Sequence, residues 1–413
     1  SIPGPEALDP EVTYLISNNG LRDGTHGFHK YAGKFIPHLS RWAIENYTHV
    51  GDTVFDPFVG SGTTLVESTL LRRQSIGGDI DPLSCLISKS KVARISDARL
   101  DKIIEEWNWY DSQCDWSTPI VGYVPKIENV SHWFSTECIC HLSRLKSFIE
   151  MSRKEEEAIF LKVVFSSIIR KASNADDQSL KSYVSHTKTK VPPPARALFA
   201  TTLADYIERL KEYNSRDPFT AQVINDFDAA EETLWPNQIK LIVTSPPYLK
   251  SIDYLYNQML EYFWIGDTFN LDVPAKQNEF KKRYIGTEKG LKGYLIPEMT
   301  SSQPWGKVIA LFSEGSDPAK IISRYFELMD GHIAIAKKKL VPGGHYAMVV
   351  GGSTICGMWI DTPSILTDIF IQHGFSRVCF WKYEIRNRHM RFPRKGRGGI
   401  IHDDHVIVFR KDE

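Results

Sequence analysis

Short runs of apolar and β-branched residues recur along the chain, and each ends in an acidic, glycine-rich or proline-rich turn. A helical pattern of apolar residues follows most of these runs. Such alternation is typical of parallel strands that are joined by crossover helices. The sequence therefore predicts an α/β fold with a mostly parallel sheet. The runs are DTVFDPFVGSG (52–62), QSIGGDIDP (74–82), AQVINDFDA (221–229), KLIVTSPPY (240–248) and HYAMVVGG (345–352).

The C-terminal part of the chain has a different pattern. Two strand-like runs, residues 377–385 and 404–410, are joined by a polar and basic loop without an intervening helical pattern. Strands that are connected without a helix usually pair in antiparallel fashion. We therefore expect an antiparallel hairpin that closes an otherwise parallel sheet.

Two long segments interrupt the alternation of strands and helices. Residues 97–219 contain helical patterns and then a polar loop, while residues 266–330 are rich in lysine, glycine, proline and aromatic residues. Both segments are too long to be ordinary connections. We predict a catalytic domain made of residues 1–96, 220–265 and 331–413, with a mainly helical inserted subdomain and a second insertion.

Composition adds a few constraints. Lysine plus arginine and aspartate plus glutamate both number 50, so attraction to a polyanion depends on local basic clusters. Six cysteines in 413 residues make no disulfide framework. Cys138 and Cys140 are spaced by one residue and lack the second pair that a zinc site needs. No apolar segment reaches membrane-spanning length, and no signal peptide is apparent. We expect no metal, no membrane attachment and a cytoplasmic location in a prokaryote.

The first predicted strand runs into a glycine-rich turn that leads to a helix. Gly60 and Gly62 allow the backbone to pass close to a ligand at this turn. The turn lacks the Gly-Lys-Ser/Thr of a phosphate-binding loop, and it lacks the third glycine of the usual dinucleotide fingerprint. The sequence therefore favours a ligand without phosphates.

Acidic residues stand at the ends of the next two predicted strands. Asp79 follows the glycine turn by roughly twenty residues, where a carboxylate can accept hydrogen bonds from both hydroxyls of a ribose. Asp81 is the alternative for this role. Asp228, after the third strand, can accept a hydrogen bond from an adenine amino group. Each of these residues can instead cap a helix or a turn. Beside the glycine turn, they predict a pocket for a nucleoside.

Three motifs, DPFVGSGTT (56–64), GGDIDP (77–82) and TSPPY (244–248), together resemble those of the S-adenosylmethionine-dependent amino-methyltransferases of DNA. The serine of the last motif is typical of the members that methylate cytosine at N4. HGFHKYAGKFIPHLSRWAI (26–44) is similar to the N-terminal cofactor segment of this family. LVPGGHYAMVV (340–350) is similar to the segment that follows its catalytic motif. About half of the chain is covered.

The resemblance implies a Rossmann-like class I methyltransferase fold with S-adenosylmethionine as cofactor. It places Phe58, Gly60, Gly62 and Thr63 around the methionine part of the cofactor, Asp79 at the ribose and Asp228 near the adenine. The complete set of expected cofactor-binding residues is Lys34, Phe35, Pro37, Asp56, Phe58, Gly60, Gly62, Thr63, Asp79, Asp81 and Asp228.

The order of the motifs is similar to that of members with a target-recognition region between the glycine motif and the catalytic motif. We therefore expect residues 97–219 to read the DNA target. Residues 266–330 are the alternative DNA contact.

The motif Ser245-Pro246-Pro247-Tyr248 suits methyl transfer to an exocyclic amine. Such an amine is a poor nucleophile because its lone pair is delocalised into the ring, so an enzyme must orient it and accept hydrogen bonds from its protons. Ser245 Oγ and the Pro246 carbonyl are two acceptors that the prolines hold in place, and Tyr248 offers a face for an extruded base. The methyl group would pass directly from sulfur to nitrogen.

Basic residues cluster between the last two predicted strands. Residues 382–397 hold seven lysines and arginines and one acidic residue. If the strand 377–385 runs parallel to the main strands, its exit lies on the ligand side. Lys188 and Lys190, in the polar loop of the insertion, form a second candidate. The expected DNA-binding residues are Arg386, Arg388, Arg391, Arg394, Lys188 and Lys190.

The predicted function is site-specific methylation of cytosine N4 in double-stranded DNA, with a cognate restriction endonuclease as the functional counterpart. Adenine N6 methylation is the nearest alternative, because the amine geometry and the chemistry are similar. Methylation of guanine N2 in structured RNA is disfavoured, since nothing resembles an appended RNA-binding module. An alternative of another class is a non-catalytic DNA-binding module that keeps a decayed cofactor fold.

Overall fold

A twisted sheet with the strand order β1-β9-β10-β6-β5-β2-β3-β4 forms the centre of the molecule. The computed structural model describes residues 2–17, 20–34, 36–177, 179, 181–185, 187, 189–250, 253–385 and 404–412. The strands of the sheet are β1 (Thr13–Ile16), β2 (Thr53–Asp56), β3 (Gln74–Asp79), β4 (Ala221–Asn225), β5 (Ile239–Thr244), β6 (Leu340–Gly351), β9 (Phe375–Ile385) and β10 (Asp404–Lys411).

The pairing confirms the predicted fold class. β2 pairs in parallel with β3 and with β5, β3 with β4, and β5 with β6. β10 is antiparallel to both β6 and β9, so the predicted C-terminal hairpin is present. β9 itself runs parallel to the main strands, and β10 is the reversed one. This is the Rossmann-like arrangement of class I methyltransferases.

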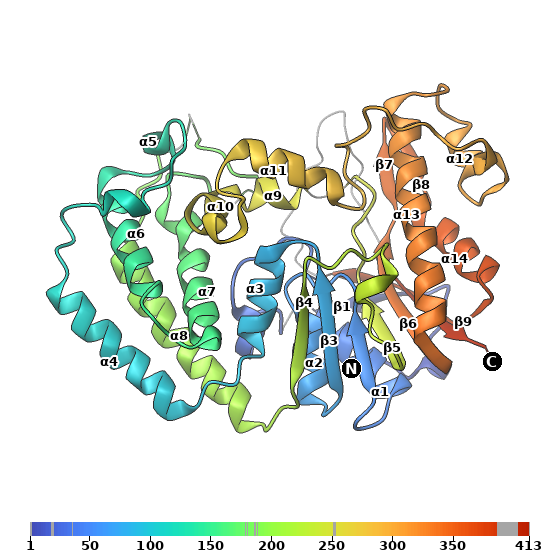
Figure 1. Cartoon of the computed structure of the whole chain (residues 1–413). Coiled ribbons are helices and arrows are strands. Elements are labelled where there is room, and N and C mark those ends of the chain that lie inside the picture. The colour runs from blue at the N-terminus through green and yellow to red at the C-terminus, as the bar shows by residue number, and fades with distance from the viewer. Residues whose placement is uncertain are drawn as a thin grey trace.

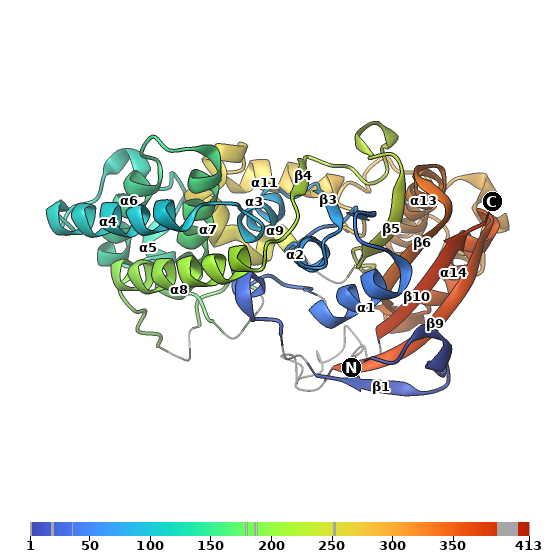
Figure 2. The same ribbon diagram turned by 90° about the horizontal axis from the view of Figure 1, so that it is seen from below.

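Strand β1 was missed by the sequence analysis. It adds to the edge of the sheet by pairing in parallel with β9, as Figure 2 shows. The strand has four residues, and its side chains alternate between exposed and half-buried positions. So short and so exposed a run carries no clear periodic signal; its place depends on the partner strand, which lies far away in the sequence.

Alternating side chains of the strands pack into two apolar layers. On one face, Val54, Leu241 and Val243 pack with Leu39 and Trp42 from the α1 segment. On the other face, Phe55, Ile242 and Met348 pack with residues of α13 and α14. Because neighbouring residues of a strand point to opposite faces, strands covered on both faces read as continuous apolar runs. The core therefore explains the pattern in the sequence.

Helices surround the sheet, and Figure 1 shows most of the insertion at one side and α13 and α14 at the other. The helices near the sheet are α1 (Pro37–Tyr47), α2 (Thr63–Leu70), α3 (Pro82–Lys91), α13 (Asp317–Lys339) and α14 (Thr362–Gln372). Those of the insertion are α4 (Asp97–Gln113), α5 (Val130–Trp133), α6 (Thr136–Ile149), α7 (Glu155–Ala172) and α8 (Ala195–Ser215). A small hairpin of β7 (Ser353–Ile355) and β8 (Met358–Ile360) follows β6.

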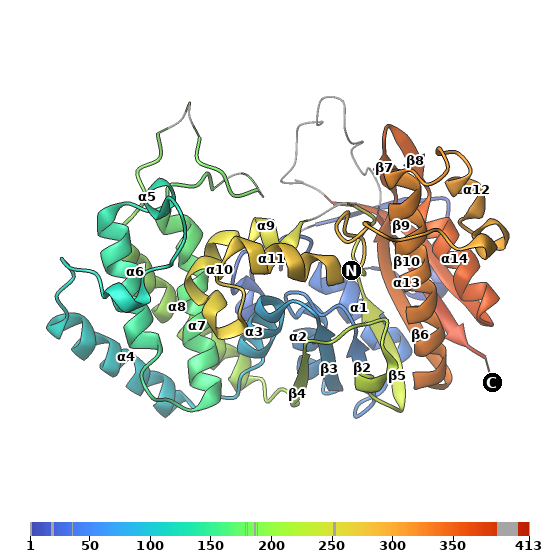
Figure 3. The same ribbon diagram turned by 45° about the horizontal axis from the view of Figure 1, so that its top comes forward.

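The insertion at 97–219 is helical in its regular elements, and it shares one continuous apolar core with α2 and α3. The catalytic motif leads into α9 (Tyr254–Asn257) and α10 (Met259–Ile265), whose apolar side chains join the same core. Figure 3 shows α9 and α11 over the middle of the molecule. The insertion therefore packs directly against the elements that carry the cofactor motifs.

The second insertion contains α11 (Pro274–Phe280) and α12 (Gly306–Ile309). Its predicted boundary at residue 330 lies inside α13, which runs without a break from Asp317 to Lys339. The apolar residues of this amphipathic helix pack on the sheet along its length, so α13 is one element and not a junction. Within the described ranges, no helix is both long and apolar enough to cross a bilayer.

Candidate active site

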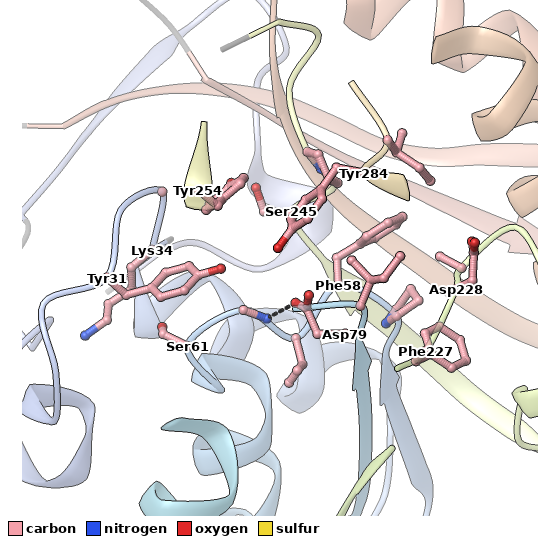
Figure 4. Close-up of a pocket in the computed structure, with 18 of the residues that line it drawn as sticks. Tyr31, Lys34, Phe58, Ser61, Asp79, Phe227, Asp228, Ser245, Tyr254 and Tyr284 are labelled. Atoms are coloured by element: carbon pink, nitrogen blue, oxygen red, sulfur yellow. Dashed lines mark hydrogen bonds between the residues drawn. The ribbon is translucent and has the colours of Figure 1, made fainter. Parts of the chain in front are cut away.

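A cavity opens at the carboxyl ends of β2, β3, β4 and β5. Figure 4 shows Asp79 and Phe58 below Ser245, with Lys34 and Tyr31 on one side and Phe227 and Asp228 on the other. Ligands of open α/β sheets bind at this edge. Residues expected from the sequence and found in the cavity wall are Lys34, Phe58, Gly60, Thr63, Asp79, Asp228, Ser245 and Pro247.

The glycine turn forms the floor of the cavity. Gly60 and Gly62 have positive φ angles of 47° and 77°. A β-carbon on Gly60 would lie 3.3 Å from the ring of Tyr31, and one on Gly62 would lie 2.9 Å from Ser88 Oγ. Both positions therefore need glycine, for the backbone conformation and for the close approach of neighbours. Gly60 lines the cavity, whereas Gly62 supports the turn from behind.

Asp79 connects the glycine turn to β3. Its Oδ2 accepts a hydrogen bond from the Gly60 amide at 2.8 Å, drawn in Figure 4, and its Oδ1 accepts one from the Asp81 amide at 2.9 Å. Burial, reinforced by the neighbouring Asp81 carboxylate, raises the pKa of Asp79 to about 7. A carboxylate held by the floor of the cavity is well placed to accept hydrogen bonds from a ligand.

Asp81 and Asp56 do not line the cavity. Asp81 caps α3: its Oδ1 accepts hydrogen bonds from the amides of Leu83 and Ser84. Asp56 accepts hydrogen bonds from Thr244 Oγ1 at 2.6 Å and from the Phe58 amide, and burial raises its pKa to about 6. The cofactor roles expected for these two carboxylates are therefore corrected to structural ones: helix capping and the fixing of one strand end to the next.

Two lysines stand at one end of the cavity: the half-buried Lys34 in its wall and the buried Lys91 outside it. Lys34 donates to the carbonyls of Leu21 and His26, and Lys91 donates to the Ser61 carbonyl at 2.6 Å. Burial lowers the pKa of Lys34 to about 8, and burial together with Lys34 lowers that of Lys91. Neither ammonium takes part in an ion pair with a described carboxylate. Lys34 therefore brings a cationic group to this end of the cavity, without a carboxylate partner among the described residues.

The other two members of the expected N-terminal set are placed differently. Pro37 is buried as the first residue of α1 and does not line the cavity. Phe35 lies outside the described residues.

The catalytic motif follows the last residue of β5. Ser245 and Pro247 line the cavity, whereas Pro246, which stands between them in the sequence, is buried. Tyr248 lies beyond the cavity wall, where its hydroxyl donates a hydrogen bond to Asp404 Oδ1 at 3.2 Å. The motif therefore presents a hydroxyl to the cofactor cavity and a tyrosine outside it.

Three tyrosines that the sequence analysis did not select cover the cavity. The ring centroids of Tyr31 and Tyr254 are 5.8 Å apart, and those of Tyr254 and Tyr284 are 6.5 Å apart, with planes inclined by 27° and 15°. The Tyr284 hydroxyl donates to Asp81 Oδ2 at 2.6 Å. Tyr31 lies in the segment 26–44 that resembles the cofactor segment of the family, and Tyr284 lies in the aromatic-rich second insertion, whereas the sequence analysis gave no signal for Tyr254.

An ion pair of 2.8 Å between Arg283 and Asp226 fastens the same segment to the end of β4. With these side chains in place the cavity is narrow, about 70 Å³. This volume is below the usual range of small-ligand sites.

The predicted DNA-binding residues are mostly beyond the described parts of the chain. Arg386, Arg388, Arg391, Arg394 and Lys188 all lie outside the described residues. Lys190 is described, and its ammonium donates to the carbonyls of Arg170 and Ala175 and to Asp177 Oδ1. These three bonds tie the polar loop to α7, which gives Lys190 a structural role.

The carboxyl end of β9 and the start of β10 lie at the same edge of the sheet as Ser245. Asp404 pairs with Gly351 at the carboxyl end of β6, and Met348 of that strand pairs with Thr244, the residue before Ser245. The predicted strand at residues 377–385 therefore runs parallel to the main strands, which was the condition for placing its exit on the ligand side.

Comparison with known proteins supports the same interpretation. A family model described as DNA methylase matches residues 13–90, which contain the N-terminal segment, the glycine turn and Asp79. The type II methyltransferase M.MvaI of Kocuria varians is 24% identical over 397 residues, which cover 90% of this chain and 87% of that protein. M.MjaII of Methanocaldococcus jannaschii is 42% identical over 98 residues, covering 24% of this chain and 18% of that one.

Among solved structures, a methyltransferase from Methanosarcina mazei aligns over 89% of this chain and 96% of its own, with 11% identity and a TM-score of 0.33. That similarity is too low to bear on function.

The sheet order, the glycine turn and the carboxylate at the end of β3 define an S-adenosylmethionine-dependent methyltransferase. The family model and the type II methyltransferases to which the chain is similar support a DNA methyltransferase of the N6/N4 family, with S-adenosylmethionine as its cofactor.

Proposed function

We propose that this enzyme methylates the N4 amine of cytosine at a specific sequence in double-stranded DNA, as the modification partner of a restriction endonuclease. The observation that carries the proposal is the position of Ser245, in the wall of the cofactor cavity at the carboxyl end of β5. The similarity to type II methyltransferases supports the biological setting.

The residues present fit the cofactor. Asp79 would accept hydrogen bonds from the ribose hydroxyls, and Asp228, at the far side of the cavity, would approach the adenine amine. The Lys34 ammonium, which has no carboxylate partner among the described residues, would meet the carboxylate of the methionine part. The buried Thr63 hydroxyl, which has no partner among the described residues, also belongs to the cavity wall. When bound, the cofactor supplies an electrophilic methyl group on a sulfonium.

The protein's part in the reaction is to orient the amine. Ser245 Oγ and the Pro246 carbonyl would accept hydrogen bonds from the two N4 protons, which points the nitrogen lone pair at the methyl group. With the cofactor bound, the amine nitrogen would take the methyl group as the carbon–sulfur bond breaks, and it would then release one proton to solvent. This route needs no enzyme nucleophile, consistent with cysteines such as Cys85 and Cys138 being buried against backbone carbonyls.

The target base would have to leave the duplex, because its amine is otherwise inside the stack. Tyr248, outside the cofactor cavity and fixed by Asp404, would support the face of the extruded base. The insertion at 97–219 and the basic segment 382–397 would hold the DNA strand through phosphate and base contacts.

The test is to incubate the enzyme with methyl-labelled S-adenosylmethionine and mixed-sequence duplex DNA, and then to digest the DNA to nucleosides. We expect label in N4-methylcytosine. Label confined to N6-methyladenine would overturn the base assignment and keep the enzyme class, while the absence of label from DNA of any sequence would overturn the function. The variant Ser245→Ala, assayed beside the wild type, separates enzyme activity from a contaminant.

A further inference from the structure

A second cavity lies beside the cofactor cavity, between the N-terminal segment, α7 and the α9–α10 region. Figures 1 and 3 show α10 beside α7. The cavity has a volume of about 330 Å³, within the range of small-ligand sites. Tyr254 lines both cavities, and the segment 29–34 separates them: Tyr31 and Lys34 face the cofactor cavity, whereas His29 and Ala32 face the second one.

Three buried polar side chains line this second cavity with an unpaired atom each. They are His29, Gln258 and Glu261, and each has a relative exposure of 5%. His29 Nε2, Gln258 Oε1 and Glu261 Oε2 find no hydrogen-bond partner among the described residues. Buried polar atoms without partners are costly, and this cavity has room for a group that satisfies them, so the three atoms around it fit a polar occupant.

The unpaired atoms are mainly hydrogen-bond acceptors. The other ring nitrogen of His29 lies 3.3 Å from the Lys30 carbonyl. A carbonyl requires a donor there, which leaves Nε2 as an acceptor. Gln258 presents its amide oxygen. Burial raises the pKa of Glu261 to about 7, so its carboxyl accepts when ionised and can also donate when protonated.

The backbone around this cavity is strained at His29, which has a φ of 56° although it is not glycine. A hydrogen bond of 2.8 Å from its amide to the Tyr206 hydroxyl of α8 holds that conformation. Such strain is maintained where the surrounding structure fixes a side chain in place.

The rim of the cavity is cationic. Arg22 and Lys171 are exposed and line it, as does Lys30, whose ammonium donates to the Asp177 carbonyl at 2.7 Å. Asp177 is the acidic residue at the rim. An acceptor-rich floor, the aromatic side chain of Tyr254 and a rim with an excess of positive charge together match a nucleotide, with its base inside and its phosphate at the entrance.

We propose that this cavity binds an amine-bearing nucleobase of the substrate DNA, one other than the base being methylated. This inference rests on the proposed function. The methylated amine belongs at Ser245, which lines the cofactor cavity and not this one. Cytosine, adenine and guanine present amino protons to the acceptors, whereas thymine presents one N–H between two carbonyls that would face acceptors. Glu261 and Gln258 are then positioning residues for the DNA, one helical turn apart.

The test uses nucleoside 5′-monophosphates as probes, with the cofactor cavity saturated by S-adenosylhomocysteine. In titrations followed by ligand-observed NMR, we expect at least one of CMP, AMP and GMP to bind about tenfold more tightly than TMP. Gln258→Leu and Glu261→Gln should each weaken that binding by about tenfold. Gln277→Leu is the matched control, because Gln277 is equally buried but lies outside the cavity. Thermal melting confirms that each variant is folded.

Duplex DNA distinguishes a base of DNA from a free nucleotide. If the site takes a base of the substrate, DNA that the wild type methylates displaces the bound nucleotide, and both variants raise the KM for DNA without changing cofactor affinity. Equal binding of TMP, absence of binding, insensitivity to both variants or failure of DNA to displace the nucleotide would each overturn the inference. A wild type that binds nucleotides but never methylates DNA would instead overturn the proposed function.

Discussion

The hydroxyl of Tyr248 donates a hydrogen bond to Asp404, which joins the catalytic motif to the first residue of β10. Asp404 pairs with Gly351 of β6 and with Tyr383 of β9, so it is fixed by strands on both sides. Residues that are about 150 positions apart in the chain are thereby held together at the edge of the sheet. The C-terminal hairpin thus orients the tyrosine that is proposed to support the target base.

Substitution of Tyr248 separates the ring from its hydroxyl. Tyr248→Ala removes the stacking surface, which is worth about 1–3 kcal/mol per base, so kcat/KM for DNA should fall by about 10- to 100-fold. Tyr248→Phe keeps the ring and loses the hydroxyl that donates to Asp404, and a smaller decrease is expected. Cofactor affinity, measured by calorimetry, should be unchanged in both variants because Tyr248 does not line the cofactor cavity. A large loss of cofactor affinity would contradict the assigned role.

Asp79→Asn should act mainly on the cofactor. Hydrogen bonds to a charged group contribute about 1.5–3 kcal/mol, so the Kd for S-adenosylmethionine should increase by about 10- to 100-fold. Asparagine retains one oxygen for the Gly60 amide, which limits damage to the turn. Calorimetry gives the Kd, and thermal melting of the variant serves as the control. Unchanged affinity in a folded variant would remove Asp79 from the ribose site.

The raised pKa of Asp79 predicts a pH dependence. Ribose hydroxyls donate to the ionised carboxylate, so cofactor affinity should rise with pH through about 7. The stability of the cofactor-free protein should change in the opposite direction. The folded state holds a proton that the unfolded state releases near its ordinary pKa of 3.8, so this contribution to stability is lost as the pH rises from about 4 to about 7. Calorimetry and denaturant unfolding across this range test both trends, and Asp79→Asn should flatten them.

Tyr284→Phe tests the attachment of the second insertion. Among the described residues, Tyr284 is the one donor to Asp81 Oδ2. Asp81 Oδ1, in contrast, accepts hydrogen bonds from two backbone amides and from the Tyr262 hydroxyl. Loss of the Tyr284 hydroxyl should lower the free energy of unfolding by about 1–3 kcal/mol, since a buried acceptor is left unpaired. Tyr262→Phe is the matched control and should lower it less. Urea unfolding measures both, and equal losses would contradict this account.

The local sequence was sufficient for the strands β2 to β6, β9 and β10 and for the edge of the sheet at which the candidate cofactor cavity opens. Apolar runs such as 240–244 are covered on both faces, and Asp79 stands where the strand end and the glycine turn place it. The sequence could not distinguish Asp79 from Asp81. The two carboxylates are only two residues apart, at the end of one strand. The start of α3 decides that Asp81 caps that helix while Asp79 lines the cavity.

The sequence by itself determined the class of fold, the glycine turn and the chemical character of the Ser-Pro-Pro-Tyr motif, because these depend on local periodicity and backbone geometry. The tertiary structure decided which side chains share a cavity. Tyr31, Tyr254 and Tyr284 come from three distant segments of the chain. His29, Glu261 and the α7 residues of the second cavity are also far apart in the sequence. Their meeting depends on how both insertions pack against the sheet, and long-range packing leaves no periodic signal in any one stretch of the chain.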